Sequence, residues 1–199
     1  FQSYAPGTQT IVEEPFFSPN YELDLELVGP VFYKISYDAF GVSKLKHIIE
    51  PHCSYRYESP VANPDRIITQ WFFYRNNYIQ YGLTNRILVK QEEMPREVFT
   101  LGLSQTFYFS PEDSPLSRYR VDGKIPEYSD LSAYLRYYPA RKYSLDISAA
   151  INPYYKTFSS LRLGASLGSP QDPAFLRVNW YKSVNPYRYE TYWDRHQIG

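Results

Sequence analysis

Residues 21–28 read Tyr-Glu-Leu-Asp-Leu-Glu-Leu-Val, with apolar and acidic side chains in alternation. Successive side chains of a β-strand point to opposite faces, so this segment predicts a strand with one apolar and one charged face. The same two-residue period recurs almost to the end of the sequence, for example in residues 143–151 and 161–167. No segment shows a sustained helical period with caps. An α/β fold is therefore disfavoured, because its parallel strands need crossover helices.

The alternation predicts nine strands, followed by a tenth at 187–193. The nine span residues 21–28, 31–39, 45–58, 78–90, 97–109, 129–138, 142–152, 158–168 and 174–183. Most are near the 9 to 11 residues that a tilted strand needs to cross a bilayer, whereas strands of soluble sheets average about five or six. Strand length therefore favours a membrane barrel over a soluble sandwich.

The connections between these strands alternate in length. One set is short, at residues 40–44, 91–96, 139–141 and 169–173. The other set includes the long stretches 59–77 and 110–128 and the tail after 183. Outer-membrane barrels have tight periplasmic turns and long external loops, so we expect the long pair to be extracellular. Turn chemistry marks three further positions: Asn63-Pro64, Asp122-Gly123 and Asn152-Pro153.

Composition narrows the class of protein. The chain has 199 residues, as many acidic as basic side chains, and one cysteine, and 19% of it is aromatic. Zero net charge and the lack of a basic stripe argue against a nucleic-acid partner. No apolar run approaches the roughly 18 residues of a membrane-spanning helix. Because the chain begins at Phe1, we expect residues 1–199 to be an excised fragment of a single barrel domain.

The energetic cost of placing a charge in hydrocarbon indicates which face of the sheet meets lipid and which meets water. Arg or Lys on the outer surface of a barrel costs about 2–4 kcal/mol at the bilayer midplane. We therefore expect a watery lumen to receive Asp24, Asp146, Arg162 and Arg177. The lipid-facing belt is expected to include Leu101, Leu103, Leu145, Ile147, Leu161, Leu163 and Val178.

Patterns that suggest chemistry have simpler structural explanations. Ser166 lies in a G-x-S-x-G sequence, but no helix is predicted after it, so we expect a strand residue and not a nucleophile. His47, Glu50 and His52 are metal-ligand types, yet in a strand His47 lies on the face opposite the other two. Cys53 is expected to pack as a small apolar side chain. We expect no catalytic residue, metal site or cofactor, and a protein that is not an enzyme.

Several segments resemble the C-terminal barrel of the LptD (OstA or Imp) family of lipopolysaccharide-assembly proteins. The fragments follow the family's order over about residues 45–168: Lys46–Pro51 with Ser54–Tyr57, Tyr81–Arg86, Leu103–Phe109, Ser129–Ala133 and Tyr138-Pro139. The sequence departs from the family after Asn85-Arg86, where a G-x-D-R element found in many relatives does not appear. The family's periplasmic jelly-roll and its cross-linking cysteines are also not in this sequence.

The resemblance implies a fold and a function. The fold is an all-β, antiparallel up-and-down transmembrane β-barrel, of which this chain is an incomplete arc of about nine or ten strands with unpaired first and last strands. The implied function is insertion of lipopolysaccharide into the outer leaflet of the outer membrane of a Gram-negative bacterium. The implied partners are lipopolysaccharide, an LptE-like plug lipoprotein, an LptA-like periplasmic bridge protein and the barrel-assembly machinery.

Three other functions remain open at the level of sequence. A general porin or receptor-type barrel has the same alternation and conducts solutes through its lumen. An outer-membrane hydrolase would use Ser166 as its nucleophile. A soluble lipid-binding barrel would stay monomeric without detergent.

Overall fold

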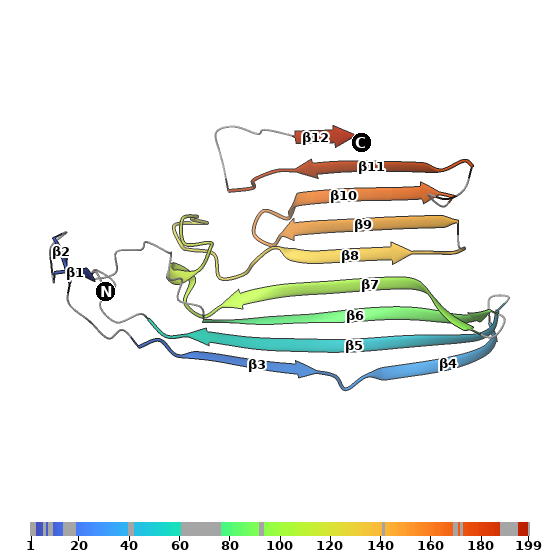
Figure 1. The fold of residues 1–199 in the computed structure, drawn as a ribbon, viewed down its shortest axis with the longest axis horizontal. Helices are drawn as coiled ribbons and strands as arrows, with labels where there is room; N and C mark the ends of the chain where they lie inside the picture. Colours follow the sequence, from blue (N-terminus) through green and yellow to red (C-terminus); the bar gives the residue numbers. More distant parts are fainter. Residues whose placement is uncertain are drawn as a thin grey trace.

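A computed structural model describes residues 3–5, 7, 10–13, 19–39, 42–60, 77–91, 94–140, 142–168, 171, 173–187 and 195–198. These residues form one ten-stranded antiparallel sheet and a separate ribbon of β1 (Ser3–Tyr4) and β2 (Ile11–Val12) (Figure 1). The strands of the large sheet are β3 (Glu22–Val28), β4 (Phe32–Ala39), β5 (Val42–Glu58), β6 (Asn77–Gln91), β7 (Met94–Tyr108), β8 (Leu131–Tyr137), β9 (Tyr143–Asn152), β10 (Thr157–Leu167), β11 (Leu176–Ser183) and β12 (Arg195–Ile198).

All nine predicted strands coincide with observed strands to within a few residues. From β5 to β12 each strand pairs with the next along the chain, as the up-and-down prediction requires. The predicted tenth strand at 187–193 falls mostly outside the described residues, and a short β12 begins after it at Arg195. The alternation in the sequence therefore located the strands correctly, because each one has its own two-residue period.

The first two strands of the sheet do not follow the up-and-down order. β3 and β4 both pair antiparallel with β5, so they form two stretches of one edge strand. Residues 29–31 of this edge face only residues 50–51 of β5, and the Gly29 N–H donates to the carbonyl of Pro51 at 2.9 Å. Pro51 has no N–H to return, so the ladder is interrupted here. The prediction of two successive antiparallel strands was therefore wrong at this position.

Strands β4, β6, β8 and β10 all end at one end of the sheet, the short-turn end, and residues 109–130 lie at the opposite, long-loop end (Figure 1). The intervals that separate these four strands from the strands after them are short, as the alternation predicted. At the long-loop end, residues 109–130 contain a 3-10 turn at Pro111–Asp113 and a small hairpin in which Val121 bridges Lys124. Asp122 and Gly123 both have positive φ in that hairpin, which confirms the predicted turn. Asn63-Pro64 lies outside the described residues.

The sheet is a single open layer. Its outer strands are β12 at one edge and β3 with β4 at the other, so the described residues form an arc and not a closed barrel. Few apolar side chains in the described part of the chain are buried, among them Ile48, Val89 and Pro126, whereas Leu25, Leu145 and Val178 are among many exposed ones. No helix among the described residues is long and apolar enough to span a membrane. The fold therefore has two broad faces instead of an enclosed core.

Candidate functional site: the polar face of the sheet

Strand register sorts the side chains into two faces. On β10, Arg162 lies between Ser148 and Tyr181, and Ser166 lies between Ser144 and Arg177. Directly opposed residues share a face, so these side chains belong to one polar surface. Following the register from strand to strand places all four predicted lumen residues on this polar face: Asp24, Asp146, Arg162 and Arg177. That this face encloses water stays a prediction.

The opposite, apolar face carries the predicted lipid-facing residues. Leu163 lies between Ile147 and Trp180, and Leu103 lies between Leu83 and Ala133. The same register places all seven on this face: Leu101, Leu103, Leu145, Ile147, Leu161, Leu163 and Val178. The structure therefore groups these side chains as the sequence suggested, while their contact with lipid stays a prediction.

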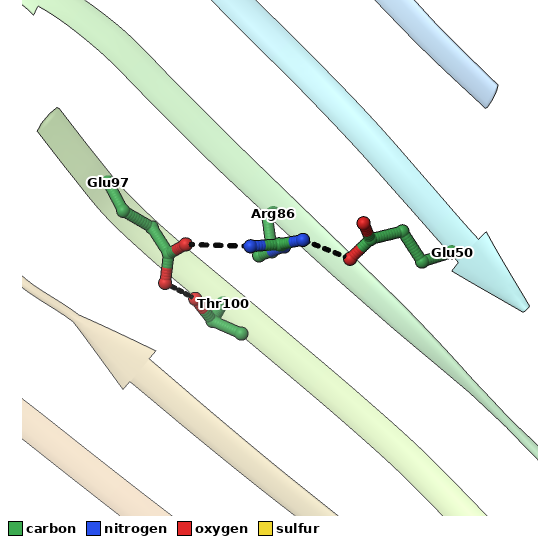
Figure 2. A network of polar contacts seen from close by, with 4 residues as sticks. All are labelled: Glu50, Arg86, Glu97 and Thr100. Carbon is green, nitrogen blue, oxygen red and sulfur yellow. Dashed lines mark hydrogen bonds and ion pairs between the residues drawn. The ribbon is translucent and has the colours of Figure 1, made fainter. Parts of the chain in front are cut away.

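A charge network crosses three neighbouring long strands on the polar face (Figure 2). Arg86 of β6 donates to the carboxylate of Glu50 on β5, and its other terminal nitrogen lies 3.7 Å from Glu97 of β7. The hydroxyl of Thr100, a buried residue, donates to Glu97. Arg86 thus joins two carboxylates. This network was not predicted from the sequence, because its residues are far apart in the chain.

A second paired arginine lies between β3 and β5. Arg56 donates to Glu22, and its Nε lies 3.8 Å from a carboxylate oxygen of Asp24. Asp24, predicted to face the lumen, is therefore an ion-pair partner on the edge strand. The sequence pattern did not predict a role for Arg56 or Glu22.

The four short strands have a different distribution of charge. Asp146 lies 3.9 Å from the guanidinium of Arg136 and accepts a hydrogen bond of 3.1 Å from the hydroxyl of Tyr138. Arg162 and Arg177 instead lie over aromatic rings, at 5.4 Å from Tyr181 and 5.3 Å from Phe175. No carboxylate in the described part of the chain lies within ion-pair distance of either arginine.

Arg162 and Arg177 line a shallow hollow of about 210 Å³ on β9, β10 and β11. Gly164 contributes no side chain, and a Cβ there would approach Oδ1 of Asn179 at 3.2 Å. Ser144 and Ser166 lie beside this space, with their hydroxyl oxygens 2.6 Å apart. The lining residues include Ser144, Asp146, Ser148, Arg162, Gly164, Ser166, Arg177 and Asn179. We call this space the arginine hollow.

A neighbouring hollow of about 340 Å³ continues toward the short-turn end. It shares Ser144 and Ser166 with the arginine hollow and adds Arg96 and Lys142. Its one carboxylate is Glu97, which already interacts with Arg86. Positive charge therefore extends from β11 to the turn after β8.

An ordered cluster at the long-loop end is centred on Asn152. This side chain is fully buried, donates to Asp130 at 2.9 Å and accepts from the N–H groups of Tyr154 and Tyr155. The hydroxyl oxygen of Tyr154 in turn accepts from the backbone N–H groups of residues 127 and 128 at 2.8 and 2.9 Å. The turn at Asn152-Pro153 was predictable from its residue types, whereas the buried contacts of Asn152 were not. The cluster fixes the end of the loop that precedes β8.

Tyr187 extends the same cluster. Its ring stacks on Tyr119 with centroids 4.2 Å apart and meets Tyr155 edge-on. Burial is the main reason that the pKa of Tyr187 is raised to about 12. The segment after β11 is therefore packed against the loop after β7.

The residues singled out for chemistry occupy ordinary strand positions. Ser166 lies within β10, where its partners are Ser144 and Arg177, so it is not on a strand-to-helix turn. The register puts His47 on the face opposite Glu50, as expected for a strand. Cys53 is a free, half-buried cysteine on the apolar face. No three His, Cys, Asp or Glu side chains of the described residues are placed to hold a metal ion.

Comparison with known proteins adds no relative. No protein-family model matches the chain, and no curated protein sequence matches it.

Proposed function

We propose that this chain is an arc of an outer-membrane β-barrel that inserts lipopolysaccharide into the outer leaflet. The observation that carries the membrane part of the proposal is the uncovered apolar face. A single layer with rows of exposed Leu and Val cannot bury that face within itself. Hydrocarbon covers such a surface at little cost, because the strands satisfy their backbone groups within the sheet.

Strand length supports a membrane position. β9 and β10 have 10 and 11 residues, which matches the roughly 9 to 11 needed for a tilted crossing. β5, β6 and β7 have 15 to 17 residues and extend further toward the long-loop end (Figure 1). That extension carries aromatic contacts on the apolar side, Tyr55 with Phe109 and Phe107 with Phe109, which suit a membrane–water interface.

The resemblance to the LptD family supports the specific cargo. Its four main fragments fall on or beside β5, β6, β7 and β8, which are consecutive neighbours in the sheet. A polar face of Ser, Thr, Arg and Asp can solvate a saccharide while acyl chains remain among apolar surfaces. Transport of this kind breaks no covalent bond, so the proposed protein is a translocon and not an enzyme.

The proposed setting follows from the same resemblance. The protein resides in the outer membrane of a Gram-negative bacterium and receives lipopolysaccharide from an LptA-like bridge. An LptE-like lipoprotein occupies the lumen, and the barrel-assembly machinery inserts the chain. The open edges at β3–β4 and β12 pair with further strands of the same barrel, since an unpaired edge in lipid leaves backbone groups unsatisfied.

Depletion of the full-length protein in its host tests the cargo. We expect lipopolysaccharide at the cell surface to fall as the protein is depleted, measured by labelling of intact cells. Normal surface lipopolysaccharide after depletion would contradict the proposed cargo. Loss of small-solute uptake with normal lipopolysaccharide would instead identify a porin or receptor barrel.

A further inference from the structure

The polar face of β8–β11 has an excess of positive charge. Three guanidiniums, those of Arg136, Arg162 and Arg177, share this surface with one carboxylate, that of Asp146. Asp146 already interacts with Arg136 and Tyr138. The positive charge of Arg162 and Arg177 is therefore not balanced by a neighbouring acid in the described residues.

This imbalance is local to the short strands. On the long strands, Arg56 and Arg86 each interact with two carboxylates. Both are less exposed than Arg162 and Arg177. The guanidiniums of Arg162 and Arg177 lie 5.4 and 5.3 Å from the ring centroids of Tyr181 and Phe175, and no acceptor among the described residues takes a hydrogen bond from them. Arg162 and Arg177 thus have the arrangement of arginines that receive an external anion.

The surrounding groups indicate the kind of anion. Guanidinium groups bind phosphate through paired hydrogen bonds, which adds geometric selectivity to charge attraction. The hydroxyls of Ser144 and Ser166 and the amide of Asn179 supply neutral donors and acceptors beside the two arginines. Gly164 leaves the centre of the space open. Neutral hydroxyl and amide groups of this kind suit the hydroxyls of a sugar.

We propose that the arginine hollow binds the phosphate group of a phosphorylated saccharide. This inference rests on the proposed function only for the source of that phosphate, which is the saccharide part of lipopolysaccharide. Free inorganic phosphate has the same chemistry and occupies the same hollow if the cargo is different. Arg162 and Arg177 contact the phosphate, and Ser144, Ser166 and Asn179 contact the phosphate or the adjoining sugar.

The test compares three probes bound to the full-length protein in a nonionic detergent without phosphate. The probes are lipopolysaccharide that carries its phosphates, the same lipopolysaccharide after removal of its phosphates, and inorganic phosphate. We expect the phosphorylated form to bind at least about tenfold more tightly than the dephosphorylated form by titration calorimetry, as charge-assisted contacts imply. The double variant Arg162→Gln/Arg177→Gln should lose this preference.

Matched variants separate binding from folding. Arg56→Gln removes an arginine that already interacts with Glu22 and Asp24, so it should keep the full phosphate preference. Asn179→Asp changes one exposed side chain almost isosterically and adds a negative charge to the hollow, so it should weaken the preference even if the double variant folds poorly. Far-ultraviolet circular dichroism checks the sheet content of each variant.

The outcomes distinguish this inference from the proposed function. Equal affinity for the two lipopolysaccharide forms and no binding of inorganic phosphate would overturn the inference, while the depletion experiment still decides the cargo. Retention of the phosphate preference in the folded double variant would also overturn it. Binding of inorganic phosphate alone, lost in the double variant, would support the hollow as a phosphate site and contradict lipopolysaccharide as its source.

Discussion

The long strands β5–β7 and the short strands β8–β11 belong to one sheet but manage charge differently. On the long strands, the polar-face arginines Arg56 and Arg86 are neutralised by carboxylates from neighbouring strands. On the short strands, Arg162 and Arg177 lie over rings and face a hollow. An arginine that is already paired stabilises the sheet, whereas Arg162 and Arg177 have no carboxylate partner among the described residues. The difference separates a region of paired charge from the region that carries the proposed phosphate site.

The largest expected effect tests whether the short-strand region is embedded in lipid. Ile147→Arg places a charge on the apolar face between Leu135 and Leu163, which should cost about 2–4 kcal/mol at the bilayer midplane. Ser148→Arg, one residue along on the exposed polar face, should change stability by less than about 0.5 kcal/mol. Denaturant unfolding of the protein in phospholipid vesicles measures both. Equal losses would contradict the assignment of the two faces.

The next effect concerns the joint between the two regions. Asn152→Ala removes a buried side chain that joins the end of β9 to Asp130 and to two backbone N–H groups. Unsatisfied buried polar groups cost about 1–3 kcal/mol, so we expect the loop end to lose about 2 kcal/mol of local stability. Amide hydrogen exchange at Tyr154 and Tyr155 should become faster. Asn179→Ala, at an exposed position, is the control and should leave these amides unchanged.

A smaller effect contrasts the two kinds of arginine directly. Arg86→Gln leaves Glu50 and Glu97 without their shared partner, and because the site is partly exposed we expect a loss of about 1 kcal/mol. Arg162→Gln removes only an exposed contact with a ring and should cost about 0.5 kcal/mol. Unfolding midpoints at low and high salt measure the difference. The Arg86 effect should shrink with salt, and an equal or larger loss at Arg162 would reverse the comparison.

The smallest effect is confined to high pH. The pKa of Tyr187 is raised to about 12 by burial, so the folded cluster holds this proton more tightly than the unfolded chain does. The stability that results is present below the ordinary tyrosine pKa of about 10 and is lost as the pH rises toward 12. Tyrosinate absorbance of the wild type minus that of Tyr187→Phe should reveal this late titration. A difference titration near pH 10 would contradict burial of Tyr187.

Much of the fold could be predicted from local sequence. The alternation at residues 143–151 located β9 and separated Asp146 from Ile147, because a strand's own period assigns each side chain to a face. The turn at Asp122-Gly123 was predictable for the same kind of reason, since few residues adopt positive φ readily. The register puts the four residues predicted to face the lumen on one face and the seven predicted to face lipid on the other, while their contact with water or lipid stays a prediction.

The partners across strands could not be predicted in this way. Glu50, Arg86 and Glu97 meet only because β5, β6 and β7 adopt one particular register. The joining of β3 and β4 into one edge depended on Pro51 lying opposite Gly29, which a local pattern does not reveal. The buried position of Asn152 likewise needed Asp130 and the loop before β8.

The sequence by itself thus determined where the strands lie and which side chains share a face, because these properties follow from the backbone geometry within each segment. Only the tertiary structure decided which arginines are neutralised and which two remain over the arginine hollow. That choice depends on the register between strands, which sets the distance between charges that are far apart in the chain.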